Sequence, residues 1–82
     1  MINLEEIKSK VRNEIENLAA KQVPNDDFNI FGEGFLDSLN VLHIILFMET
    51  EFGMKINPYD LHIDVLNSVN KIVSFIESKI ND

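Results

Sequence analysis

The sequence predicts an all-α fold: one bundle of three longer helices and one short helix. Apolar residues recur at steps of three and four in three separate segments, which is the spacing of one face of an α-helix. No segment alternates apolar and polar residues as a half-buried strand does. The chain has 82 residues, enough for one small domain, so we assign residues 1–82 to a single domain.

The first helix is predicted over 3–21. Its apolar stripe consists of Leu4, Ile7, Val11, Ile15 and Leu18. Asn3 and Glu6 have the spacing of a capping box at the start of the helix. We expect Pro24 to end it, because proline cannot continue a helix.

A long connection over 22–37 follows. It contains Pro24, Gly32 and Gly34, and the two glycines are expected to let the backbone turn. It also carries five large apolar residues, namely Phe28, Ile30, Phe31, Phe35 and Leu36. A connection this long is uncommon in a small domain and is usually functional when ordered. Its aromatic content predicts that it packs onto the helices.

The second helix is predicted over 38–52, with Gly53 as its stop. At about 100° per residue, one face carries Val41, Ile44, Ile45, Met48 and Phe52. The opposite side carries Leu39, His43, Leu46, Phe47 and Thr50. Because both sides are apolar, the helix is either the buried centre of the bundle or presents a docking surface on its second face. Periodicity does not choose between these two interpretations.

Two further helical segments complete the prediction. Asn57 and Pro58 indicate the start of a short helix that includes 59–64, with proline at its first position. Asn67 or Ser68 is expected to cap a last helix over 68–80. The residues expected to face inward in that helix are Val69, Ile72, Val73, Ile76 and Ile80.

Composition excludes several classes of function. The net charge of −7 disfavours nucleic acid as a partner, because phosphate binding requires a basic surface. The chain contains no cysteine, which excludes disulfides and thiolate metal sites. No apolar run reaches the roughly 18 residues of a membrane span, and the N-terminus lacks the apolar core of a secretory signal. We therefore expect a cytoplasmic protein that is not embedded in a membrane.

Charge is distributed unevenly. The stretch from Gln22 to Met54 has no lysine or arginine but holds six acids: Asp26, Asp27, Glu33, Asp37, Glu49 and Glu51. These acids either keep a small domain soluble or steer basic partner proteins towards the middle of the chain. Charge alone leaves both interpretations open.

Ser38 is the candidate reactive group, and the sequence argues against a hydrolase, a calcium loop and a transition-metal site. A hydrolase needs a base beside the serine, but His43 lies about 140° round the helix and His62 is distant in sequence. A calcium loop starting at Asp27 lacks the required oxygen ligands at its fifth and twelfth positions. Two isolated histidines also make a transition-metal site improbable.

Ser38 is then either a helix cap or an acceptor for a group that another enzyme attaches. Asp-Ser before an apolar run is a typical helix start, and Asp37 can itself be the cap. A helix N-terminus, with unpaired N–H groups and a partial positive charge, also favours a phosphodiester on the serine.

The segment "GFLDSL", 34–39, resembles the Asp-Ser-Leu motif of the acyl carrier protein family. The resemblance covers essentially the whole chain, including "METEFGMKI" at the end of the second helix. It implies an acyl-carrier-like four-helix bundle with a short third helix. It also implies that Ser38 carries 4'-phosphopantetheine, attached from coenzyme A by a phosphopantetheinyl transferase. Asp37 and Leu39 would complete the motif, with Asp37 as the helix cap.

A carrier of this family is not an enzyme but a monomeric covalent shuttle for acyl or aminoacyl thioesters. Its implied partners are an activating ligase and a downstream acyltransferase or synthase. The residues expected to contact partners are Leu39, His43, Leu46, Phe47, Glu49, Ile63 and Leu66.

Within the family, the sequence is most similar to carriers of the D-alanyl type, which serve teichoic acid D-alanylation. It departs from fatty-acid carriers, which present several acids where this chain has His43 and Thr50. The alternative of another class is a helical interaction module in which Ser38 only caps the helix.

Overall fold

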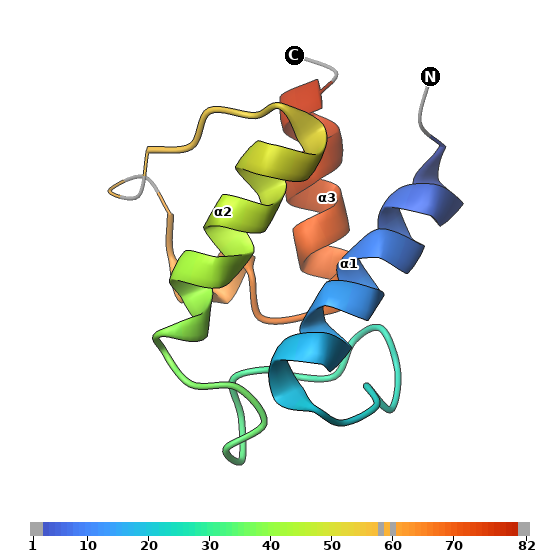
Figure 1. The fold of residues 1–82 in the computed structure, drawn as a ribbon, viewed down its shortest axis with the longest axis vertical. Coiled ribbons are helices and arrows are strands. Elements are labelled where there is room, and N and C mark those ends of the chain that lie inside the picture. Colours follow the sequence, from blue (N-terminus) through green and yellow to red (C-terminus); the bar gives the residue numbers. More distant parts are fainter. Residues whose placement is uncertain (1–2, 58, 60, 81–82) are drawn as a thin grey trace.

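Three α-helices form the framework of the computed structural model, which describes residues 3–57, 59 and 61–80 (Figure 1). They are α1 (Leu4–Ala19), α2 (Asn40–Phe52) and α3 (Val69–Ile80), and a short 3-10 helix, η2 (Ile63–Val65), precedes α3. These described ranges contain no strand. The all-α prediction is confirmed: among the described residues, three longer helices and one short 3-10 helix make up the bundle.

Helix α1 begins as the sequence predicts and ends earlier. The side chain of Asn3 accepts a hydrogen bond from the backbone N–H of Glu6 at 2.8 Å, which is the expected cap. The helix stops at Ala19 because Ala20 takes a left-handed conformation, with φ 57°. Pro24 lies four residues further on, so the prediction that it ends the helix is wrong.

The start of α2 is a 3-10 turn. The N–H groups of Asn40, Val41 and Leu42 each donate to the carbonyl three residues earlier, at 3.1, 3.3 and 3.2 Å. Regular α-helix therefore begins at Asn40, two residues later than predicted. Gly53, with φ 65°, ends the helix as expected, because glycine adopts this left-handed conformation without strain.

Helix α3 is capped by Ser68, whose Oγ accepts a hydrogen bond from the N–H of Lys71 at 3.1 Å. This confirms one of the two caps considered from the sequence. The short helix expected over 59–64 overlaps only in part with the 3-10 helix η2, which begins at Ile63, whereas Leu61 and His62 are not helical. Pro58 and Asp60 lie outside the described residues, so the predicted proline start is not tested.

The core lies where the three helices meet. It contains Ile7, Val11 and Ile15 of α1, Ile44, Ile45 and Met48 of α2, and Val69, Ile72, Val73 and Ile76 of α3. Leu4, which belongs to the predicted apolar stripe of the first helix, and Ile80, which was predicted to face inward, are both exposed. Each belongs to the outermost turn of its helix, so it lies beyond the mutually covered part of the bundle.

The connection between α1 and α2 packs onto the helices, as its aromatic content predicted. Ile30 and Leu36 are buried in the core, and the Phe28 and Phe35 rings pack edge to face with centroids 5.0 Å apart. The N–H of Ile30 donates to the carbonyl of Asn67, which ties the connection to the start of α3. Gly34 supplies a turn with φ 74°.

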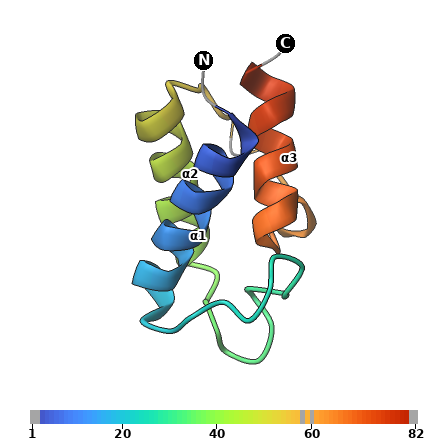
Figure 2. The ribbon, with the colours of Figure 1, turned by 90° about the vertical axis from the view of Figure 1, so that its right-hand side faces the viewer.

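Asp26 links this connection to two helices. Its carboxylate accepts a 2.6 Å hydrogen bond from Arg12 of α1 and lies 3.5 Å from Lys8. Its backbone carbonyl accepts from the N–H of Asn70 in α3 at 3.0 Å. Figure 2 shows the connection across one end of the helices, the end at which α2 begins. Asp26 therefore fastens the connection to α1 through its carboxylate and to α3 through its backbone carbonyl.

Candidate functional site

Ser38 lies exposed in the 3-10 turn that leads into α2. Asp37, not Ser38, supplies the side chain that caps this turn. Its Oδ1 accepts hydrogen bonds from the N–H groups of Leu39 and Asn40 at 3.0 and 3.2 Å. In return, the side chain of Asn40 accepts from the N–H of Asp37 at 3.0 Å. This reciprocal pair holds the turn without using Ser38, which is exposed.

The sequence suggested that unpaired backbone N–H groups at the start of the second helix would favour a phosphate on Ser38. In the structure, the N–H groups of this turn already have acceptors. Asp37 takes the N–H groups of Leu39 and Asn40, and backbone carbonyls take those of Val41 and Leu42. A phosphate on Ser38 would therefore gain from the partial charge of the helix start more than from free donors. The neighbouring carboxylate of Asp37 would oppose that gain.

Both histidines are exposed, and they lie on different elements of the fold. His43 is exposed and borders a shallow hollow together with Glu14, Leu46, Phe47, Thr50 and Glu51. His62 is exposed at the start of η2. In the part of the chain that the structure describes, no group of three or more His, Cys, Asp or Glu side chains is arranged to hold a metal ion.

An apolar stripe runs from the site along the outer side of α2. Its residues are Leu39, Leu42 and Leu46, whose exposed fractions are 69, 63 and 60 %. We refer to these three residues as the leucine stripe. Leu42 was missing from the sequence-based set, although the steps from 39 to 42 and from 42 to 46 are the three and four of a helical face. Of the two interpretations of α2, these exposures favour a free second face.

Other residues expected to contact partners have different environments. Ile63 is exposed, on η2. Phe47 is half-buried and packs edge to face against Phe52, with centroids 5.8 Å apart. Glu49 is half-buried, and its carboxylate accepts a hydrogen bond from the N–H of Ile56 at 3.2 Å, so it braces the segment after α2. Leu66 is fully buried, so the expectation that it contacts partners is wrong.

Cations of α1 engage some of the acids in the middle of the chain. The hydrogen bond from Arg12 holds the pKa of the Asp26 carboxyl below its usual range. Glu51 forms an ion pair with Lys10, and its hydrogen bond raises the pKa of that ammonium. These two acids therefore brace the fold, whereas Asp37 remains beside Ser38.

None of the described helices is long and apolar enough to cross a membrane.

The chain is similar in sequence to several proteins that are named as carriers. No protein-family model matches the chain. The acyl carrier protein of Thermotoga maritima is 33 % identical over 86 aligned positions, which cover 98 % of this chain and 99 % of that protein. A D-alanyl carrier protein of Lactococcus lactis subsp. cremoris is 29 % identical over 68 % of this chain and 71 % of its own length. D-alanyl carrier protein 2 of Lactiplantibacillus plantarum is 25 % identical over 92 % of this chain and 95 % of its own length.

Proposed function

Because the chain belongs to the acyl carrier protein family and functions as a carrier, we propose that Ser38 is the residue that bears a covalent 4'-phosphopantetheine arm. The supporting observation is the division of roles in the turn before α2. Asp37 provides the cap, and Ser38 lies beside it with an exposed side chain. Modifying the serine therefore leaves the hydrogen bonds that start the helix intact.

Ser38 fits the chemistry of such an attachment. A serine that receives its group from a transferase needs access for the incoming enzyme, and it needs no base of its own. Asp37 would act as a positioning residue that fixes the turn carrying the hydroxyl. When attached, the arm supplies the thiol that this cysteine-free chain lacks, on which acyl or aminoacyl groups are carried as thioesters.

The leucine stripe is proposed as the contact surface for partner enzymes. It is apolar and exposed, and it begins next to Ser38, so a partner bound there would also face the arm. His43 and the exposed Ile63 would border this contact. The proposed partners are a phosphopantetheinyl transferase, an activating ligase, and a downstream acyltransferase or synthase. The carrier would itself be a monomer without catalytic activity, acting in the cytoplasm.

An aminoacyl cargo is the second candidate. Two of the relatives are named D-alanyl carrier proteins. On the face of α2 that would meet a partner, this chain has His43 and Thr50, both exposed and neither acidic. Assay of the arm-bearing protein against a panel of amino-acid-activating and fatty-acid-activating ligases would separate an aminoacyl carrier from a general acyl carrier.

The attachment is tested by intact mass. The purified chain is incubated with coenzyme A, Mg²⁺ and a broad-specificity phosphopantetheinyl transferase. We expect a gain of one phosphopantetheine in the wild type and none in Ser38→Ala. Ser74→Ala, which changes an exposed serine on α3, is the matched control and should gain the group normally. An unmodified wild type, or a gain that persists in Ser38→Ala, would rule out Ser38 as the attachment residue.

A further inference from the structure

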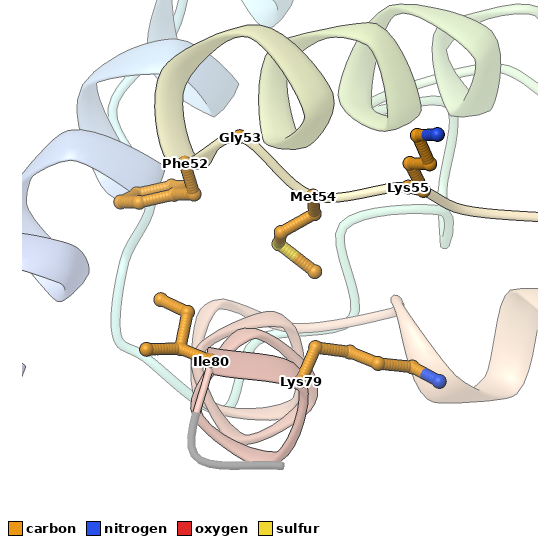
Figure 3. A pocket seen from close by; sticks show the side chains of 6 residues that line it. All are labelled: Phe52, Gly53, Met54, Lys55, Lys79 and Ile80. Atoms are coloured by element: carbon orange, nitrogen blue, oxygen red, sulfur yellow. The ribbon is translucent and has the colours of Figure 1, made fainter.

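A hollow at the end of the bundle remote from Ser38 combines an apolar side with two lysines (Figure 3). It lies between the segment after α2 and the last turn of α3, and has a volume of about 380 Å³. Phe52, Gly53, Met54, Lys55, Lys79 and Ile80 line it. Figure 3 shows Phe52 and Ile80 on one side of Met54 and both lysine side chains on the other.

A smaller hollow of about 140 Å³ shares the same two lysines. Its other lining residues are Ile56, Asn57, Leu61 and Phe75, three of which are apolar. Lys55 and Lys79 therefore stand between two recesses that both offer apolar surface. The Nζ of Lys79 also lies 5.8 Å from the centre of the Phe75 ring.

None of the described residues that line the two hollows is acidic. The ion pairs found among the described residues involve Lys8, Lys10 and Arg12. The partial negative charge at the end of α3 accounts for Lys79 in its last turn. It does not account for Lys55, which lies outside the helices on the segment after Gly53.

We propose that this end of the molecule binds an aliphatic carboxylate. The carboxylate would lie between the ammonium groups of Lys55 and Lys79, and the chain would lie against Phe52, Met54 and Ile80. Charge complementarity selects an anion, and the apolar side selects an aliphatic tail over a small hydrophilic ion. The larger hollow has the size of a small-molecule site, for which about 300–1,000 Å³ is typical.

This site is independent of the arm proposed on Ser38. Lys55 and Gly53 follow the C-terminal end of α2, whereas Ser38 precedes its N-terminal end. The protein as a whole carries a net charge of −7, which repels anions. Binding should therefore require both lysines and weaken as salt screens them.

The test is a titration of the isotopically labelled protein with sodium octanoate, followed by amide NMR shifts. We expect saturable shifts at Gly53, Met54 and Ile80. Acetate has the charge without the chain, and octylammonium has the chain with the opposite charge, so neither should reproduce them. Raising sodium chloride from 50 to 500 mM should weaken octanoate binding to the wild type severalfold.

Two variants locate the site. The double variant Lys55→Gln/Lys79→Gln should bind octanoate at least tenfold more weakly, whereas Lys71→Gln, an exposed lysine elsewhere on α3, should bind normally. Thermal melts should show that all three proteins remain folded. The proposal is overturned by a wild type without saturable shifts, by equal shifts with octylammonium, or by unchanged affinity in the folded double variant. Shifts confined to the leucine stripe would also overturn it.

Discussion

Replacing Asp37 by alanine tests which side chain starts the second helix. Asp37 accepts two backbone hydrogen bonds, from Leu39 at 3.0 Å and Asn40 at 3.2 Å. Loss of an N-cap acceptor costs about 0.5–2 kcal/mol. Because two donors lose their partner, we expect Asp37→Ala to lower the free energy of unfolding by about 1–2 kcal/mol. In a domain of this size, each kcal/mol corresponds to a drop of roughly 4–8 °C in Tm.

Urea unfolding followed by circular dichroism measures this change. Asp37→Asn keeps a side-chain oxygen that can accept, so it should remain close to the wild type. Ser38→Ala is the matched neighbour. Since the cap belongs to Asp37, its free energy of unfolding should stay within about 0.5 kcal/mol of the wild type. A loss in Ser38→Ala as large as that in Asp37→Ala would refute the assignment of roles and make the serine structural.

Two further predictions concern the connection between α1 and α2 and the leucine stripe. Asp26→Asn should lower the free energy of unfolding by about 1 kcal/mol or less at pH 7, because Asp26 is partly exposed and its pairs with Arg12 and Lys8 are screened. The folded-state pKa of Asp26 is depressed, so its contribution is complete above the unfolded value of about 3.9 and disappears as pH falls through the folded value. Denaturation at a series of pH values should show the variant and wild type converging in acid, and a constant difference would contradict the ion pair. Leu42→Asp places a charge on a side chain that is 63 % exposed, so stability should change by less than about 0.5 kcal/mol while kcat/KM for arm attachment falls at least tenfold. Unchanged attachment kinetics in this variant would remove Leu42 from the contact surface.

The parts of the fold that were predictable depend on interactions within a few residues. Asn3 caps α1 through Glu6, and Ser68 caps α3 through Lys71, because each bond spans three positions. Gly53 ends α2 for an equally local reason, since glycine adopts a positive φ without strain. The Asp-Ser pair before an apolar run is a signal of the same local kind, and it singled out Ser38 as the candidate residue.

Tertiary contacts decided which apolar side chains are buried and which are exposed. Leu66 and Ile63 are near neighbours in the sequence, yet Leu66 is buried and Ile63 is exposed. The exposure of Leu42 likewise follows from the position of the other helices, because they cover Ile44, Ile45 and Met48 but not the outer side of α2. Such burial depends on elements far away in the chain, and helical periodicity alone does not contain that information.

By itself, the order of residues determined three helices, most of their caps and one candidate serine, since propensity, capping and apolar spacing act over a single turn. The sequence offered both Asp37 and Ser38 as caps, and only the folded chain showed that the Asp37 carboxylate takes the amides of Leu39 and Asn40 while Ser38 is exposed. Only the folded chain brought Lys55 and Lys79, 24 positions apart in the sequence, to one hollow. The reason is that a side chain is buried or exposed according to the segments that pack against it. Those segments are distant in the sequence and meet only in the folded chain.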